Sequence, residues 1–441
     1  MSKYQAYSEY KDSGSKLLGD VPEHWQLSRV KYVAEITPKK PIVDRSLKCS
    51  FIPMEKLKTD SIILDETKQI DTVYDGYTYF ADGDILMAKV TPCFENKNIA
   101  IAKGLTNKIG FGSSEIYTIR ASEKVVNRFL YYRLQEDGFM DLAIGAMTGA
   151  GGLKRVPSEV VANYIYASPE DGEQQKIANF LDHETAKIDT LIEKQQQLIK
   201  LLKEKRQAVI SHAVTKGLNP NAPMRDSGVE WLGEVPEHWA MPKISHIGRV
   251  LNGSTPDKSN LSYWEGGAVP WLASGCLNSE IVDEPSHLIS EAAYQNSSVE
   301  LIPTDSLLVG MVGQGKTRGT SAILAINSCI NQNMAAIIPN EKVKIRFLYF
   351  LFQAMYDDLR ELGRGGNQAA LNCEIISSIR IPLPPIEEQT AIVDMLDELL
   401  IKLGDTDTLG EVQITLLQER RTALISAAVT GKIDVRNWKA V

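Results

Sequence analysis

The fold is decided by the stretch EQQKIANFLDHETAKIDTLIEKQQQLIKLLKEKRQAVISHAVTK, residues 173–216. It contains neither proline nor glycine, and good helix formers fill nearly all of it, so the sequence predicts one long helix. At about 1.5 Å per residue this helix extends roughly 60 Å, far more than an ordinary globular helix. Its apolar residues recur with the heptad spacing of a coiled coil. Such a helix needs a partner helix along its apolar seam.

The predicted seam has two alternating positions. Polar residues interrupt it at Glu184, Gln195 and Lys205. The first position is occupied by Ile177, Leu191 and Leu198, and the second by Leu181, Ile188, Leu202 and Val209.

A second copy of this pattern lies near the C-terminus and supplies the partner. Residues 387–432 read EEQTAIVDMLDELLIKLGDTDTLGEVQITLLQERRTALISAAVTGK, and Gln389 lies 215 residues after Gln174. The second copy carries Gly404 and Gly410 where the first has better helix formers, and each glycine costs about 1 kcal/mol relative to alanine. We therefore predict a bent or frayed middle in residues 399–412 and an intact first helix, on which partner binding depends more heavily.

Two further motifs repeat and extend the duplication beyond the helices. DSGSKLLGDVPEHW (12–25) returns as DSGVEWLGEVPEHW (226–239), and RFLYY (128–132) returns as RFLYF (346–350). We interpret the tryptophan that ends each of the first pair as a core anchor, not as part of a catalytic site with the preceding histidine. The second pair predicts a helix that packs its aromatic side chains inward.

Between these motifs the two halves share little sequence. Short apolar runs separated by Gly, Pro, Asn and Ser predict a mixed α/β, strand-rich body in each half. The motifs at the ends of each half repeat, whereas the sequences between them differ. We therefore predict two related recognition modules that read different targets. The predicted boundaries are a first recognition domain (1–170), a long helix (171–216), a linker (217–229), a second recognition domain (230–384), a second long helix (385–432) and a C-terminal tail (433–441).

Each body ends in a glycine-rich loop, at residues 145–155 and 363–368. Backbone amides and basic side chains on such loops can approach phosphate, and ordinary turn chemistry explains the glycines equally well. Both interpretations stay open.

Residues 310–317, GMVGQGKT, match the P-loop pattern GxxxxGK[ST]. A P-loop also requires a helix that begins at the Lys-Thr pair, because the helix N-terminus binds the phosphates. The following residues, RGTSAILAI, resemble another strand. We therefore favour a basic hairpin loop suited to a nucleic-acid groove over a nucleotide-binding site.

Composition narrows the remaining classes. The 441 residues carry a net charge of −8, which argues against a general nucleic-acid coat but permits a local basic face. The five cysteines are scattered without a CxxC pair, which predicts reduced thiols and no zinc site. No run of about 18 apolar residues occurs, so we expect a cytoplasmic protein without a membrane contact. We find no Rossmann, GxSxG, HExxH or amino-methyltransferase motif, and expect no catalytic residues and no metal site in this chain.

The order of these motifs resembles the DNA-specificity subunit of type I restriction-modification systems. The resemblance covers essentially the whole chain. It rests on the two VPEHW motifs, on IPLPP (381–385) before Glu388-Gln389, and on SAAVTGK (426–432).

The resemblance implies an α+β fold in which two pseudo-twofold-related target recognition domains are joined by two long antiparallel helices, a coiled-coil spacer. Each domain would read one half of a bipartite, asymmetric site in double-stranded DNA. The partners would be two modification subunits, which methylate adenine, and restriction subunits, which translocate and cleave DNA. S-adenosylmethionine, ATP and Mg would then belong to those partners, with no cofactor in this chain.

Base edges are read by forked donors and acceptors, so Arg, Lys, Asn, Gln and Thr on loops are the candidates. The alternatives are a coiled-coil interaction scaffold without DNA specificity and a P-loop nucleotide-binding protein. Our DNA-binding candidates are Lys89, Thr91, Lys97, Lys154, Arg155, Gln314, Lys316, Thr317, Arg318, Arg364, Asn367 and Gln368. Our partner-binding candidates on the helix seam and ends are Gln174, Ile177, Leu181, Ile188, Leu191, Leu198, Leu202, Gln389, Leu396, Leu403 and Leu417.

Overall fold

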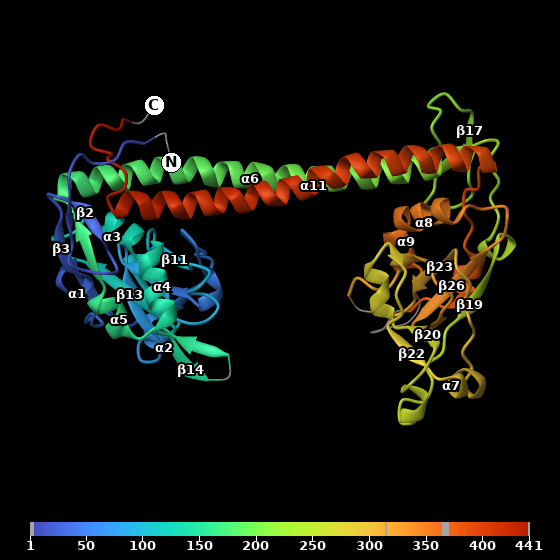
Figure 1. Cartoon of the computed structure of the whole chain (residues 1–441), viewed down its shortest axis with the longest axis horizontal. Coiled ribbons are helices and arrows are strands. Elements are labelled where there is room, and N and C mark those ends of the chain that lie inside the picture. The colour runs from blue at the N-terminus through green and yellow to red at the C-terminus, as the bar shows by residue number, and fades with distance from the viewer. Residues whose placement is uncertain (1–3, 151, 314, 364–369, 440–441) are drawn as a thin grey trace. The chain divides into compact units, whose positions relative to one another are not determined.

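A computed structural model of the chain describes residues 4–150, 152–313, 315–363 and 370–439. The chain divides into two compact units. Unit 1 comprises residues 1–196 and 411–441, and unit 2 comprises residues 197–410. Figure 1 shows both units with their element labels.

Two long helices contribute to both units. Helix α6 (Asp171–Lys216) has 46 residues and helix α11 (Ile386–Val429) has 44. Unit 1 contains the beginning of α6 and the end of α11, and unit 2 contains the other halves. The two ribbons lie side by side within each unit, so they run antiparallel there (Figure 1). The α+β class with two long paired helices is confirmed.

A glycine terminates each long helix in the same way. Gly217 follows α6 with φ +77°, and Gly431 follows the end of α11 with φ +79°. A residue in the left-handed region stops a helix at little cost only when it lacks a Cβ.

The predicted break in α11 is wrong, because this helix is continuous from Ile386 to Val429 through both glycines. The hydroxyls of Thr406 and Thr408 bond back to the carbonyls of Lys402 and Gly404, one turn earlier. About 1 kcal/mol per glycine is too little to break a cooperative helix within a paired segment.

The seam of α6 also differs from the prediction in its register. Ile177, Leu181 and Ile188 are buried as expected, whereas Leu191 is 51% exposed and Leu198 is 45% exposed. Ile192 and Ile199, each one residue later, face inward instead. Sequence spacing alone does not distinguish two adjacent apolar residues where the helix drifts relative to an exact heptad.

The body of unit 1 contains two four-stranded sheets. Five shorter helices accompany these sheets. The first sheet has the order β11 (Ile99–Ile101), β10 (Ile85–Ala88), β13 (Ile116–Ala121), β4 (Ala34–Ile36). The second has the order β8 (Thr67–Gln69), β5 (Lys48–Ile52), β12 (Ile109–Gly112), β9 (Thr78–Ala81). The helices of the body are α1 (Val30–Val33), α2 (Ile70–Val73), α3 (Asn127–Arg133), α4 (Asp137–Gly145) and α5 (Ser158–Asn163).

The body of unit 2 has a related topology, with five strands in one sheet and three in the other. Its larger sheet has the order β19 (Gly248–Asn252), β26 (Met334–Pro339), β23 (Ser306–Gly310), β24 (Ser321–Leu324), β21 (Ile281–Val282). Its smaller sheet has the order β22 (His287–Ile289), β20 (Val269–Leu272), β25 (Cys329–Ile330). The helices of this body are α7 (Glu291–Asn296), α8 (Ile345–Ala354), α9 (Tyr356–Glu361) and α10 (Cys373–Ser378).

The remaining strands form two-stranded pairs. They are β1 (Tyr10–Asp12) with β2 (Asp20–Pro22), β3 (Gln26–Arg29) with β16 (Ile165–Ser168), β6 (Leu57–Lys58) with β7 (Ser61–Ile62), β14 (Thr148–Ala150) with β15 (Leu153–Arg155), and β17 (Met224–Asp226) with β18 (Glu234–Pro236).

Strand β10 in the first sheet of unit 1 and strand β23 in the larger sheet of unit 2 are central strands that are buried on both faces. In β10, Ile85 and Met87 join the core that contains α3 and the long helices, while Leu86 faces a separate cluster. In β23, Leu307 and Leu308 are divided in the same way. Burial on both faces explains why these segments are continuous apolar runs.

The aromatic helix predicted in each half is confirmed. Phe129, Tyr131 and Tyr132 of α3 are fully buried in unit 1, and Phe347 and Phe350 of α8 are buried in unit 2. Each helix shares one core with a central strand and with both long helices, so it links the body of its unit to the helix pair.

Candidate nucleic-acid interface

A glutamate near the start of each long helix binds the VPEHW motif. In unit 1, Glu173 accepts a hydrogen bond from Trp25 Nε1 at 3.2 Å and contacts His24 Nε2 at 2.8 Å. In unit 2, Glu388 accepts from Trp239 Nε1 at 3.1 Å and contacts His238 Nε2 at 2.9 Å. The structural interpretation of these motifs is confirmed, because both indoles are almost completely buried.

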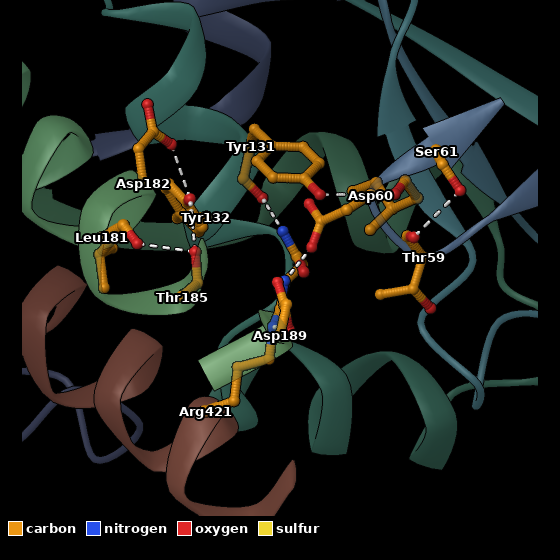
Figure 2. Close-up of polar contacts among 12 residues, drawn as sticks. Thr59, Asp60, Ser61, Tyr131, Tyr132, Leu181, Asp182, Thr185, Asp189 and Arg421 are labelled. Carbon is orange, nitrogen blue, oxygen red and sulfur yellow. Dashed lines mark hydrogen bonds and ion pairs between the residues drawn. The ribbon is translucent and has the colours of Figure 1, made fainter. Parts of the chain in front are cut away.

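A second pair of contacts joins the aromatic helix of each body to a long helix. Arg128 Nε donates to Asp182 at 2.6 Å, and Arg346 Nε donates to Asp397 at 2.9 Å. Figure 2 shows Tyr132, which also donates to Asp182 at 2.7 Å. The two carboxylates lie 215 residues apart, so the duplication extends to individual contacts.

A buried glutamine makes a third repeated contact. Gln174 Oε1 accepts from the backbone N–H of Val126 at 2.9 Å, and Gln389 Oε1 accepts from that of Lys344 at 2.8 Å. Both side chains also donate to the carbonyl five residues before them. These two partner-binding candidates therefore act inside the chain, holding the body against its helix.

Unit 1 also has a contact that joins its two long helices to the body. Arg421 of α11 donates to Asp189 of α6 at 2.9 Å and also bonds Asp60 in the turn between β6 and β7 (Figure 2). The residues equivalent to Arg421 and Asp189 are Arg206 and Gly404, so the acceptor on the second long helix is missing from unit 2. The first body is thereby attached to both long helices.

The other partner-binding candidates divide into buried and exposed residues. Ile177, Leu181, Ile188 and Leu396 are buried within their units. Leu202, Leu403 and Leu417 are partly buried, and Leu191 and Leu198 are the exposed members of the set. Only the partly buried and exposed residues offer surface to another protein.

Four DNA-binding candidates of unit 1 are brought together at the end of β10. The hairpin β14–β15 lies against this point, since Thr91 N–H donates to the Lys154 carbonyl at 3.1 Å and Val156 N–H donates to the Lys89 carbonyl at 2.9 Å. Val90 and Arg155 form a bridge between the two segments. Lys97 lies apart, because its Nζ donates to the Gln135 carbonyl at 3.0 Å.

The charge of this cluster is moderated by Glu115, which the sequence interpretation missed. Arg155 donates to both carboxylate oxygens of Glu115, at 2.9 and 2.7 Å. These bonds lower the pKa of Glu115 below its ordinary value, and Lys89 adds to the effect. Lys154 is exposed and has no salt-bridge partner within the described part of the chain. No local sequence signal links Glu115 to Arg155, because the pairing depends on the sheet.

In unit 2 the candidate loop connects β23 to β24. Lys316 is exposed, and Thr317 and Arg318 are partly buried. Helix α9 holds the loop backbone: Tyr356 OH donates to the Lys316 carbonyl at 2.8 Å, and Arg360 Nη1 donates to the Gly315 carbonyl at 2.8 Å. The sequence interpretation missed both of these supporting residues. Gln314, Arg364, Asn367 and Gln368 lie outside the described residues.

The loop is a hairpin and not a P-loop. Strands β23 and β24 pair antiparallel, with Val309 opposite Ser321. The helix that a P-loop requires after the Lys-Thr pair is replaced by a strand, as predicted from the poor helix formers in residues 318–321.

Within the described residues, no group of three or more His, Cys, Asp or Glu side chains could hold a metal ion. No helix of that part of the chain is both long and apolar enough to span a bilayer.

Part of the chain matches a known family model. Residues 236–407 match the model described as the type I restriction modification DNA specificity domain. This segment is therefore similar to the DNA specificity domain of type I restriction-modification systems. The resemblance predicted from the repeated motifs is confirmed.

Some relatives match only part of this chain, and others match nearly all of it. The chain is 38% identical over 161 residues to the type I restriction enzyme EcoAI specificity subunit of Escherichia coli, a match that covers 36% of this chain and 27% of that subunit. The first relatives are thus matched over far less than two thirds of their length. The MjaVIII specificity subunit of Methanocaldococcus jannaschii is 21% identical over 440 residues, which cover 95% of each chain.

Two solved structures share the fold of this chain. One was determined in work on complex assembly and conformational transition of the type I R-M system. It is 16% identical, with a TM-score of 0.75, over 94% of this chain and 99% of that one. The other is the HsdS subunit of Thermoanaerobacter tengcongensis, 16% identical with a TM-score of 0.56, over 94% of this chain and 98% of that one.

Proposed function

We propose that this chain is the sequence-recognition subunit of a type I restriction-modification complex. The body of unit 1 reads one half of a bipartite, asymmetric site in double-stranded DNA, and the body of unit 2 reads the other half. The paired long helices set the distance between the two half-sites, since half-site separation follows from protein geometry.

One observation carries this proposal. In both units the residue that follows a central strand accepts a backbone hydrogen bond from a residue that comes after a glycine-rich stretch of sequence: the Lys89 carbonyl from Val156 N–H, and the Met311 carbonyl from Leu371 N–H, both at 2.9 Å. The backbone position repeats, but the side chains do not. An exposed lysine lies close in sequence to this bond in each unit: Lys154 comes two residues before Val156, and Lys316 comes five residues after Met311. A repeated frame with different basic loops supports two readers of unlike sequences.

The partners follow from the same proposal. Two modification subunits dock on the long helices and methylate adenine with S-adenosylmethionine, and restriction subunits use ATP and Mg. This chain contributes specificity and no catalytic residue to those reactions, which take place in the cytoplasm. The names of its relatives, all specificity subunits, support this division of labour.

A second candidate is an interaction scaffold without DNA specificity. It is favoured by apolar side chains that the long helices leave in solvent, including Leu191, Leu201, Ile401 and Leu416. A scaffold of this kind assembles with its partners and leaves DNA untouched.

The test is duplex binding by the chain assembled with its modification subunit. We expect tight binding to one bipartite sequence, weakened several-fold by Lys316→Ala and by Lys154→Ala, with a salt dependence reduced by about one phosphate contact for each. Lys342→Ala, an exposed lysine on another loop, is the control and should bind normally. Equal affinity for all DNA sequences would contradict the proposal and favour an interaction scaffold without DNA specificity.

A further inference from the structure

Unit 2 contains a cavity of about 460 Å³ that the basic hairpin does not line. It lies on the smaller sheet, where β20 and β22 supply Trp271 and His287. Trp264 forms a second wall, and Asn331, Asn333 and Lys258 complete the polar side. The volume lies within the range of about 300–1,000 Å³ typical of small-molecule pockets.

The aromatic rings form a rigid corner. The Trp264 and Trp271 ring planes meet at 89° with centroids 5.1 Å apart, and Trp264 is also perpendicular to His287. Both indole N–H groups are already used, by the Asp257 carbonyl at 3.2 Å and the Ser254 carbonyl at 3.0 Å. The rings are therefore fixed in place. Trp271 is only 4% exposed, so the ring face that a ligand can reach belongs mainly to the half-buried Trp264.

The polar side of the cavity retains hydrogen-bonding capacity. Asn331 Oδ1 accepts from the backbone N–H of Asn333, but its amide nitrogen and the whole side-chain amide of Asn333 have no partner in the described ranges. Lys258 and His287 are exposed and likewise form no ion pair there. An aromatic face beside free amides suits the stacking surface and the edge of a nucleobase, and a lysine suits its phosphate.

The first body lacks this cavity lining, although the strands correspond. Trp271 is paired with both Cys329 and His287 across its sheet. The strand residue of unit 1 with the matching pairings is Ser50, opposite Gly110 and Thr67. The two aromatic positions of unit 2 are thus a serine and a threonine in unit 1. The cavity therefore belongs to the body of unit 2 and not to the architecture that the two bodies share.

We propose that this cavity, lined by Trp264, Trp271, His287, Asn331 and Asn333, binds one unpaired nucleobase. The base stacks on the fixed indole corner while the asparagine amides bond its edge, an arrangement that suits adenine. A base inside a duplex cannot enter a concave pocket, so the DNA source must be an extruded or unpaired nucleotide. A free nucleotide carries the same chemistry. For DNA, the inference rests on the proposed function.

The test uses the full-length chain and two probes. The first is adenosine 5′-monophosphate in a calorimetric titration. The second is a labelled duplex with one unpaired adenine, compared with the fully paired duplex and with an abasic site in place of that adenine. We expect the unpaired adenine to bind more tightly than both comparison duplexes, and Trp264→Leu to weaken that preference about 5- to 150-fold.

Two further variants keep the result interpretable. Trp231→Leu is the matched control, because Trp231 lies outside the cavity and the equivalent residue of unit 1 is Leu17. It should leave the preference within twofold. Asn333→Ala, which removes an unused amide and no core side chain, should also weaken binding if Trp264→Leu does not fold.

The outcomes separate this inference from the proposed function. Preference for the unpaired adenine identifies the DNA strand as the source, and binding of the monophosphate without that preference identifies a free nucleotide. Equal binding of all three duplexes together with no monophosphate binding overturns the inference, as does wild-type affinity in Trp264→Leu and Asn333→Ala. Recognition of a bipartite duplex is scored separately, so either idea can fail alone.

Discussion

Glu173 and Glu388 hold corresponding motifs with different numbers of partners. Both accept from an indole and contact a histidine, but Glu173 also accepts from Tyr7 OH at 2.6 Å. The residue equivalent to Tyr7 in the second half is Asn221. The first glutamate is also the less exposed of the two, at 12% against 27%.

We therefore predict that Glu173→Ala lowers the free energy of unfolding by about 1–2 kcal/mol more than Glu388→Ala does. The difference reflects one additional buried donor left without an acceptor. Chemical denaturation followed by tryptophan fluorescence measures both variants. Equal losses would mean that the Tyr7 contact contributes nothing.

Glu115 neutralises the charge of Arg155, which donates to both of its carboxylate oxygens. Glu115→Gln keeps the shape of the side chain and removes its charge, so Arg155 becomes available to phosphate. We expect tighter DNA binding by the assembled complex, with a salt dependence steeper by about one released counterion. Binding measured at several salt concentrations tests this, and an unchanged slope would contradict it.

The sequence predicted individual residues only where a local rule applied. Trp25 and Trp239 were identified as anchors because a large indole after Val-Pro has few other uses. The position of Lys97 on a polar loop predicts a place in the interface. In the structure its Nζ donates a hydrogen bond to the Gln135 carbonyl. Its partner is 38 residues away, and no spacing rule reveals it.

Helix α11 contains two glycines, Gly404 and Gly410, which have a low helix propensity. Gly404 lies in mid-helix, and a Cβ added there would meet nothing within 4 Å. We predict that Gly404→Ala stabilises the protein by about 1 kcal/mol, which thermal or chemical unfolding measures.

Gly217 provides the matched control for this prediction. It has φ +77°, and a Cβ there would lie 3.1 Å from Glu388 Oε1 and 3.2 Å from the Trp239 ring. Gly217→Ala should therefore be destabilising. If Gly404→Ala also destabilised the protein, the helix would have a reason for its glycine that local geometry does not supply.

The corrected seam of α6 is tested by two adjacent residues. Leu198 is 45% exposed, whereas Ile199 is 9% exposed. We predict that Ile199→Ala costs about 2 kcal/mol or more and that Leu198→Ala costs about 0.5 kcal/mol or less. Equilibrium unfolding distinguishes them, and the reverse order would restore the seam inferred from spacing.

The sequence predicts the long helices better than it predicts which of their residues face the partner helix. The absence of glycine and proline over residues 173–216 was enough to establish the length of α6, and the inward-facing aromatics of α3 and α8 followed from their repetition. The choice between Leu198 and Ile199 depends on how two helices pack, which the sequence of one helix does not contain.

At the scale of the whole molecule, the duplication is the central feature. Both bodies have the same strand order around β10 and β23, and the same three contacts to the long helices. The exposed loops beside those strands differ, and so does the nucleobase cavity of unit 2. A shared frame with independent surfaces predicts that the two bodies recognise their half-sites independently.

The most direct test of this account is a domain exchange at Gly217, in which residues 1–216 are replaced by the corresponding half of a relative. Methylation mapping of cells that carry the complex with either chain would then give the recognised motif. We predict a two-part motif for the natural chain and a change confined to one part in the exchanged chain. A change in both parts, or a motif without two parts, would contradict the account.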